Sequence, residues 1–296
     1  MAASSYSASA PATIMLFGEH AVLHHKLALV AAVDQRLTVT LAPREDREVH
    51  LISALGEYHT TLDHLNISAP FHFVLTCIDY FLPSLITGMN LTITSSFSST
   101  VGLGSSAAVV AATTHCLMQW LEHQGDLFTI AQQIVQRVQG CGSGADVAAS
   151  IYGGVIAYRI EPLCIEPLNV HPQITLIYAG YKTPTPEVIR LVQERNSTEK
   201  LTHLYEQIDM CVQQAKQALR DKDLDTLTSL MAEHHAYQQA LGVSDAILDL
   251  IVQEHAAQGA KISGSGLGDC VLVLGHITQS KHGTVIPIQI SPKGIN

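Results

Sequence analysis

The sequence predicts an α+β protein built from two lobes. Short apolar runs rich in β-branched residues are grouped early in the chain, whereas amphipathic helical patterns dominate later. Strands and helices do not alternate strictly, which argues against a doubly wound parallel sheet. At 296 residues, of which 47% are hydrophobic, the chain is long enough for two domains of ordinary size.

Strands are predicted first, because several early runs are short, apolar and bounded by glycine or polar residues. They cover Thr13–Phe17, Leu27–Val33, Leu37–Leu41, Val49–Ser53 and Leu91–Thr94. Apolar residues spaced three and four apart then predict helices over Phe71–Phe81, Ser105–His123, Leu127–Val138 and Ala145–Tyr152. Residues 1–10 are small and polar, without the basic start of a signal peptide, and we expect them to form a frayed end.

The second half of the chain predicts a lobe that is rich in helix. Strands are expected at Val155–Tyr158, Ile174–Tyr178, Ala260–Ile262, Val271–Leu274 and Thr284–Ile290, and amphipathic helices at Thr198–Arg220, Leu224–Ala240 and Ser244–Gln258. The proline-rich segment Thr183–Pro186 predicts a connecting turn. A boundary within residues 167–182 gives a first domain of residues 1–175 and a second of residues 176–296. The amphipathic helices after Thr198 offer an apolar stripe that a homodimer could bury.

Charge and cysteine content exclude several classes of function. The formal net charge is -10 with 16 lysines and arginines, so nucleic acid would be repelled. The six cysteines show no Cys-x-x-Cys spacing, which fits the reduced thiols of a cytoplasmic protein better than disulfides or a zinc site. No apolar run reaches the ~20 residues of a membrane-spanning helix, so no membrane partner is expected.

The segment Ser98–Ala108 has the sequence Ser-Ser-Thr-Val-Gly-Leu-Gly-Ser-Ser-Ala-Ala. Its glycines, Gly102 and Gly104, and its last two serines lead into an apolar helix, whose first turn carries unpaired N–H groups and a partial positive charge. This arrangement predicts a cradle for the phosphates of a nucleotide, although glycine and serine also begin helices that bind nothing. The Gly-Lys pair of a Walker loop is absent, so the segment is not an ordinary P-loop.

Three further segments carry groups suited to chemistry. Glycine-rich residues 140–144 lead to Asp146 at a predicted helix start, where a carboxylate can accept or orient a hydroxyl proton near a transferring phosphate, or simply stabilise the helix. The loop Lys261–Cys270 has three glycines on alternate positions, which let the backbone approach a ligand or another loop. Gly18-Glu19-His20 ends the first strand with an acid and an imidazole that could hold a hydroxyl or carboxylate of a small substrate, or could simply lie on the surface.

Together these segments resemble the ordered motifs of the GHMP kinases, a family named for galactokinase, homoserine kinase, mevalonate kinase and phosphomevalonate kinase. The resemblance is carried by residues 9–36, 102–108, 144–154 and 261–270, and their order and spacing make it specific. Within the family, the segment Phe17–Leu29 looks most like the mevalonate kinase branch. Gly180-Tyr181-Lys182-Thr183 resembles a loop of bacterial members.

The resemblance implies a first lobe like domain 2 of ribosomal protein S5 and a ferredoxin-like second lobe, with ATP and substrate in the cleft between them. It implies ATP- and Mg²⁺-dependent phosphorylation of the primary hydroxyl of mevalonate, a step of isoprenoid synthesis. By position, Asp146 and Thr13 would be catalytic; Glu19, His20, Lys26, Gly144 and Lys182 would bind the acceptor; Gly102, Leu103, Gly104, Ser105, Ser106, Ala107, Gly264, Ser265 and Gly266 would bind ATP; and Ser106 would also contact magnesium.

The chain departs from the family's pattern at charged positions. Thr13 stands where the motif Ala-Pro-Gly-Lys usually places its lysine, Val135 stands where a magnesium-binding glutamate is usual, and Asp269 replaces a frequent glycine. Asp146 with magnesium, the backbone amides of the loop and Lys182 or Lys26 could then replace the missing charges. Two alternatives stay open: a phosphomevalonate kinase or other small-molecule kinase of the family, and a catalytically silent relative that binds nucleotide.

Overall fold

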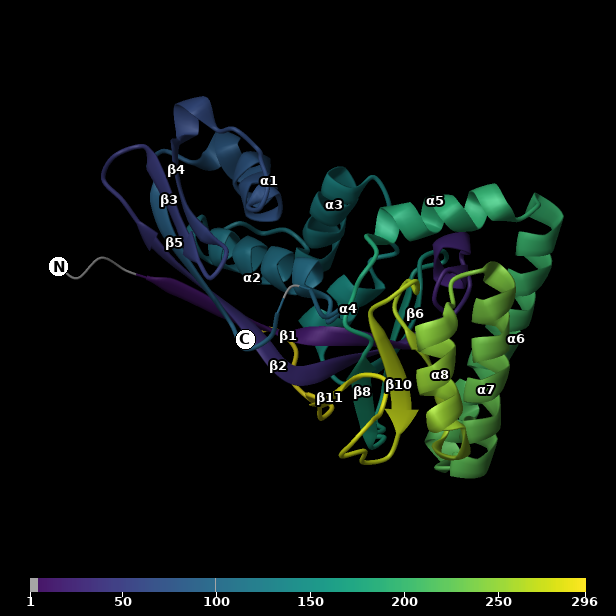
Figure 1. Cartoon of the computed structure of the whole chain (residues 1–296). Helices are drawn as coiled ribbons and strands as arrows, with labels where there is room; N and C mark the ends of the chain where they lie inside the picture. Colours follow the sequence, from purple (N-terminus) through teal and green to yellow (C-terminus); the bar gives the residue numbers. More distant parts are fainter. Residues whose placement is uncertain (1–4, 99) are drawn as a thin grey trace.

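The computed structural model describes residues 5–98 and 100–296, which form two β-sheets with helices packed against both (Figure 1). The first sheet contains β1 (Tyr6–Phe17), β2 (Ala28–Pro43), β3 (Glu48–Ser53), β4 (Gly56–Thr61), β5 (Met89–Ser95), β6 (Val155–Arg159) and β7 (Cys164–Leu168). Its strand order is β4-β3-β5-β2-β6-β7, with β1 paired to β2. The second sheet, in the order β11-β8-β10-β9, contains β8 (Ile174–Tyr178), β9 (Ala260–Ser263), β10 (Cys270–Leu274) and β11 (Thr284–Pro287). The predicted α+β, two-lobed fold is confirmed.

The helices divide between the two lobes. The first group is α1 (His72–Phe81), α2 (Ser105–Trp120), α3 (Leu127–Gln139) and α4 (Ala145–Tyr152); the second is α5 (Thr185–Arg195), α6 (Thr198–Asp221), α7 (Leu224–Leu241) and α8 (Ala246–Glu254). Short 3₁₀ turns cover Ala21–His24, Leu62–His64, Leu82–Ser84 and Ala256–Gln258. Figure 1 shows α1–α4 over the first sheet, with α6–α8 gathered beside the second. No helix in the described part of the chain is long and apolar enough to cross a membrane.

The long antiparallel pair of β1 and β2 separates two hydrophobic cores. One edge of β2 pairs with β1, while the other edge pairs with β6 near its start and with β5 near its end. Alternate residues face different cores, so Val30 packs in the core of α1–α4, whereas Leu29 and Ala31 pack in the core that contains β8, α6 and α7. Because both faces are buried, this strand pair is apolar over much of its length.

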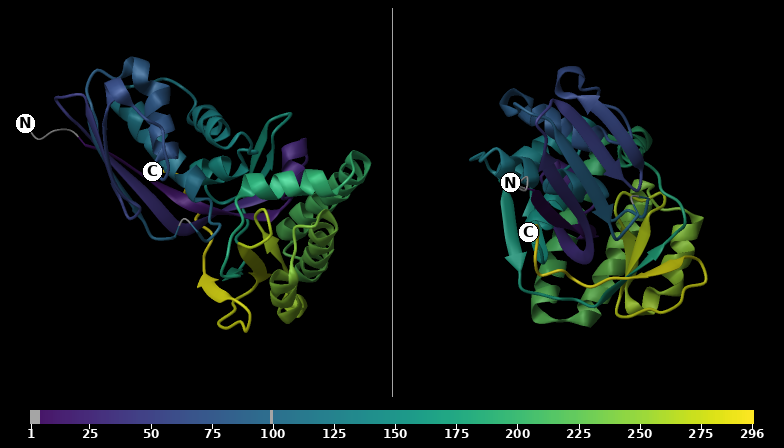
Figure 2. Two further views of the ribbon diagram at one scale, coloured as in Figure 1. Left: turned by 45° about the horizontal axis from the view of Figure 1, so that its top comes forward. Right: turned by 90° about the vertical axis from the view of Figure 1, so that its left-hand side faces the viewer.

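The sheets divide between β7 and β8, inside the boundary segment 167–182 predicted from the sequence. The end of the chain, however, returns to the first lobe: Ile290 bridges Val33, and Asn296 exchanges backbone hydrogen bonds with Ser9. Figure 2 shows this yellow C-terminal segment leaving the second sheet toward the first. The C-terminal segment therefore packs against the first lobe, and a division of the chain at residue 175 stays a prediction.

Several local predictions need correction. Residues 6–10 are paired in β1 with Ala8 and Ala10 buried, so they are not a frayed end; residues 1–4 lie outside the described part. The runs Leu27–Val33 and Leu37–Leu41 belong to one strand, because the pairing with β1 shifts its register at the polar residues between the runs and then continues from Arg36. The strands β4 and β7 were not predicted: β4 is short and largely polar, and β7 is only five residues long and contains a proline.

The apolar stripes of α6 and α7 are used inside the chain. Ile208, Val212 and Leu230 lie in the second core, packed with residues of β8 and β10. A homodimer therefore stays a prediction, and it needs a surface other than these stripes.

Candidate active site

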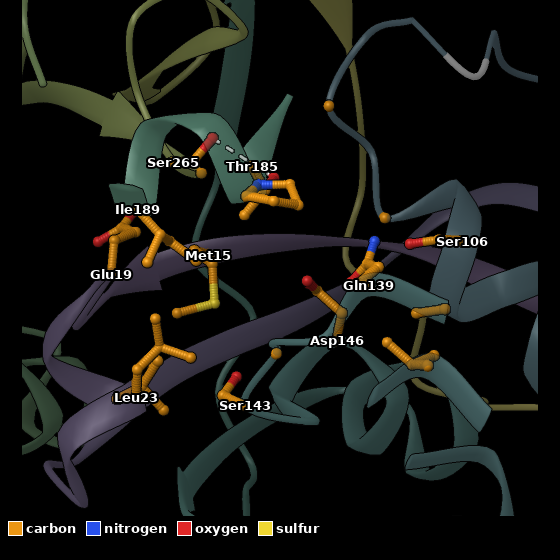
Figure 3. A pocket seen from close by; sticks show the side chains of 18 of the residues that line it. Met15, Glu19, Leu23, Ser106, Gln139, Ser143, Asp146, Thr185, Ile189 and Ser265 are labelled. Atoms are coloured by element: carbon orange, nitrogen blue, oxygen red, sulfur yellow. Dashed lines mark hydrogen bonds between the residues drawn. The ribbon is translucent and has the colours of Figure 1, made fainter. Parts of the chain in front are cut away.

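A cavity of about 340 Å³ lies between the lobes, and residues from both of them line it. Its walls come from β1 and the turn after it, the start of α2, the connection from α3 into α4, residues 182–189 and the loop between β9 and β10. Figure 3 shows Asp146 between Ser106 on one side and Glu19, Met15 and Leu23 on the other. This volume suits a small-molecule ligand.

The fold brings most of the predicted site residues to this one cavity. The lining includes Glu19, His20, Gly102, Gly104, Ser105, Ser106, Ala107, Gly144, Asp146, Lys182, Gly264 and Ser265. Thr13 lies behind the lining and contacts Asp146, and the Leu103 carbonyl accepts a hydrogen bond from the Thr13 backbone N–H. Gly266 packs against Val243, and Lys26 lies outside the lining.

The start of α2 is built to leave backbone N–H groups open. Gly104 caps the helix in the left-handed region at φ +63°, and a Cβ there would lie 1.9 Å from the Thr13 Oγ1 atom. The first intrahelical bond of this turn runs from the Ala108 N–H to the Gly104 carbonyl. The N–H groups of Ser105, Ser106 and Ala107 are therefore unused by the helix and can hold phosphate oxygens.

Asp146 occupies the first turn of α4, two residues after the N-cap Gly144. Its Oδ1 atom accepts a hydrogen bond of 2.8 Å from the Thr13 hydroxyl. Burial raises the pKa of Asp146, while the Thr13 hydrogen bond and the charge of Lys182 act in the opposite direction. The result is a fixed carboxylate that is more basic than an exposed one and still has its second oxygen for a ligand.

Glu19 is held by a buried ion pair that the sequence analysis missed. Lys261 is fully buried. Its Nζ atom donates to the Glu19 Oε1 atom at 2.5 Å and to the backbone carbonyl of Ile262. Burial raises the pKa of Glu19 and lowers that of Lys261, and the attraction between them opposes both shifts. The Glu19 Oε2 atom is buried without a hydrogen-bond partner in the described part of the chain, so it can accept a ligand hydroxyl.

Two neutral imidazoles flank Glu19. The Nε2 atom of His234 accepts the Gly18 backbone N–H at 2.9 Å, so it cannot also donate to the Glu19 carboxylate 3.4 Å away. The His20 Nε2 atom lies 2.8 Å from the Ser265 carbonyl, which can only accept, so this nitrogen carries the hydrogen. Burial lowers the pKa of both side chains. The Nδ1 atom of His20 is then left as an acceptor.

Positive charge at the cavity comes from the second lobe. Lys182 is the one lysine or arginine among the described residues that line it, and its Nζ atom lies 3.3 Å from the Asp269 Oδ1 atom. The Asp269 side chain packs beside Gly102, where a Cβ would lie 2.6 Å from Oδ1. The loop between β9 and β10 thus packs against the segment that precedes α2.

Some of the lining was not predicted from the sequence. Met15, Val22, Leu23 and Ile189 belong to its apolar part. Ile189 belongs to α5, which begins where the sequence analysis expected only a turn. Pro186 followed by Glu187 was the available signal, because proline and acidic residues are enriched in the first turn of a helix.

The described residues contain no group of three or more His, Cys, Asp or Glu side chains that could hold a metal ion. The Ser106 hydroxyl lines the cavity beside the open N–H groups. Mg²⁺ accepts such a site, because it is commonly held by few protein ligands together with nucleotide phosphates and water. The residues present therefore fit a magnesium–nucleotide complex and not a metal held by the protein alone.

Comparison with known proteins agrees with this geometry. The family model for the GHMP kinases N terminal domain matches residues 72–154, and that for the GHMP kinases C terminal domain matches residues 215–281. The mevalonate kinase of Pyrococcus furiosus is 30% identical over 309 residues, covering 95% of this chain and 92% of that protein. The crystal structure of Methanococcus jannaschii mevalonate kinase, 22% identical, matches with a TM-score of 0.79 over 98% of this chain and 99% of that one. The crystal structure of Lactococcus lactis galactokinase complexed with galactose, 18% identical, matches with a TM-score of 0.84 over 99% of this chain and 95% of that one.

Proposed function

Because the chain belongs to the GHMP kinases, a family of ATP-dependent small-molecule kinases, we propose that its reaction is phosphorylation of the primary hydroxyl of mevalonate. The observation that supports it most is the shared cavity, which places Asp146 with the open N–H groups of α2 and with Glu19. Two relatives named mevalonate kinase, at 30% identity, favour this acceptor over others.

The proposed reaction needs few groups from the protein. The N–H groups of Ser105, Ser106 and Ala107 hold the phosphates of ATP. The acceptor hydroxyl oxygen attacks the γ-phosphorus, the bond to the β,γ-bridging oxygen breaks, and ADP leaves with that electron pair. Asp146 takes the hydroxyl proton, and the Thr13 hydroxyl keeps its carboxylate in place. Magnesium, bound by the phosphates and the Ser106 hydroxyl, would neutralise phosphate charge.

The charge of the cavity argues for an acceptor with one negative charge. Mevalonate carries one carboxylate, whereas a phosphorylated acceptor adds a dianionic group that needs several cations. Lys182 is the sole lysine or arginine lining the described cavity, and it already faces Asp269. The apolar side chains of Met15 and Leu23 suit a short carbon skeleton, with Glu19 available for its hydroxyl.

The test is an acceptor panel. The purified protein with ATP and magnesium is offered mevalonate, phosphomevalonate, galactose and homoserine, and ADP release and the phosphorylated product are measured. Mevalonate is expected to give the highest kcat/KM. Faster turnover of another acceptor would contradict the substrate assignment. ATP binding without turnover of any acceptor would favour the silent relative, for which Thr13 and Val135 are the sequence evidence.

The rate should fall on the acid side at a higher pH than an ordinary aspartate predicts. Only the ionised Asp146 can take a proton, and its pKa lies above the usual value of about 3.9 because partial burial removes water from around it. The groups that face it are the Thr13 hydroxyl, Lys182 and Asp269. The midpoint of the pH dependence of kcat is compared with the titration midpoint of the Asp146 carboxyl group, followed by ¹³C NMR. The signal of that group is identified by its absence in Asp146→Asn. A midpoint at or below about 4 would contradict the assignment.

A further inference from the structure

Asp269 is an unusual residue for its position. Its backbone lies in the left-handed region at φ +65°, a conformation that disfavours side chains, and its side chain is 5% exposed. The carboxylate packs between two glycine loops: a Cβ at Gly102 would lie 2.6 Å from Oδ1, and one at Gly264 would lie 3.3 Å from Oδ2. Backbone strain and a buried charge at the edge of a cavity both cost stability, which suggests that the side chain has a function.

The partner of Asp269 is Lys182, which precedes α5 and lines the same cavity. The Nζ to Oδ1 distance of 3.3 Å is that of an ion pair, yet Oδ1 has no hydrogen-bond partner within the described residues. The ion pair therefore fixes where the Lys182 ammonium group lies and leaves its N–H donors for a ligand. The charge of Lys182 acts on the carboxyl groups of both Asp146 and Asp269.

A positive charge is required on this side of the cavity. Phosphoryl transfer depends on stabilising the charge of the moving phosphoryl group, and Thr13, at the position where the family usually has lysine, supplies a hydroxyl to Asp146 instead. An unpaired Asp269 carboxylate beside Gly102 would moreover repel the phosphates. Lys182 can both stabilise the phosphoryl group and neutralise Asp269, because it is the one lysine or arginine among the described residues that line the cavity.

We propose that Lys182 supplies, from the second lobe, the cationic contact to the transferring phosphoryl group, and that Asp269 is the positioning residue that holds its ammonium group beside Asp146. The inference rests on the proposed function of the cavity as a kinase site. Lys182 and Asp269 would then act together in place of the lysine that is missing at position 13. Asp269 itself stands where the family frequently has glycine.

The experiment is a double-mutant cycle of Lys182→Met and Asp269→Asn, with kcat and both KM values measured. Lys182→Met is expected to lower kcat about 100-fold, and Lys182→Arg to recover part of this loss. Asp269→Asn is expected to lower kcat about tenfold while changing either KM less than threefold. The double variant should be as active as Lys182→Met or slightly more active, because Asp269 acts through Lys182 and its unpaired charge is also removed. The exposed Lys200→Met is the matched control and should behave as wild type.

Two results would overturn the inference. If the two losses multiply in the double variant, Asp269 acts independently of Lys182, for example as a metal ligand. If Lys182→Met keeps kcat within threefold of wild type, Lys182 is not the cation. Asp269→Gly guards against misfolding, because glycine adopts φ +65° without strain. It should keep the wild-type thermal midpoint and lose kcat as Asp269→Asn does.

Failure of the proposed function would look different. A wild-type protein that ignores mevalonate and phosphorylates another acceptor overturns the acceptor assignment alone, and the cycle is then run with the acceptor it uses. If it phosphorylates none, calorimetric titration with a non-hydrolysable ATP analogue and magnesium decides. Equal affinity of wild type and Lys182→Met would overturn the inference, and weaker binding by Lys182→Met would support it.

Discussion

Asp146→Asn is expected to lower kcat about 10²–10⁴-fold, the range that a positioned proton acceptor contributes. The amide oxygen can still accept the Thr13 hydroxyl, so the geometry at the start of α4 should persist. What the variant loses is the basic oxygen, because an amide cannot take the hydroxyl proton. Affinity for an ATP analogue should change little, since the N–H groups that hold the phosphates belong to α2. Single-turnover kinetics and calorimetry check the two expectations separately.

A matched control for this variant is Asp225→Asn. Asp225 has the same place in the first turn of α7 that Asp146 has in α4, but it is exposed and lies outside the cavity. Asp225 has the same favourable interaction with the helix dipole as Asp146, but it has no contact with the cavity. It should therefore leave kcat unchanged. If Asp146→Asn kept kcat within a few-fold of wild type, the carboxylate would have only that structural role.

The features that could be predicted from the sequence are those encoded in neighbouring residues. The apolar stretches of β1 and β2 were predicted as strands because burial on both faces makes them apolar without a helical period, whereas the extent of the two strands and their pairing were not. The start of α2 was found because glycine followed by serines and alanines marks a helix with an open first turn. Asp146 was found in the same way, since Gly144 and the apolar run after it mark the start of α4.

The features that could not be predicted depend on contacts between distant residues. Glu19 and Lys261 are 242 positions apart, and nothing in either segment indicates that they share one buried ion pair. Thr13 looked like a lost cation, whereas in the structure its hydroxyl donates to Asp146. Leu23 and Met15 look like core residues in the sequence, and only the tertiary structure shows that they line a cavity.

Lys261→Met is expected to destabilise the protein by about 3–5 kcal/mol, the cost of leaving a buried charge without its partner. Glu19 is 3% exposed and Lys261 is fully buried, so water cannot replace the lost contact. The methionine fits a site that already faces the Phe17 ring, 5.7 Å from the ammonium group, so packing is largely kept. The free energy of unfolding, measured by urea denaturation near neutral pH, gives the loss.

Two further variants separate charge from packing in this result. Glu19→Gln combined with Lys261→Met removes both charges and should recover much of the lost stability, because no unpaired ion stays buried. Lys216→Met breaks an ion pair of the same 2.5 Å length with Glu166, whose carboxylate is 37% exposed, and should cost no more than about 1 kcal/mol. Equal losses for Lys261→Met and Lys216→Met would show that burial does not set the strength of the Glu19–Lys261 pair. A double variant as unstable as Lys261→Met would place the cost in packing, and the orientation of Glu19 toward the cavity would then need another cause.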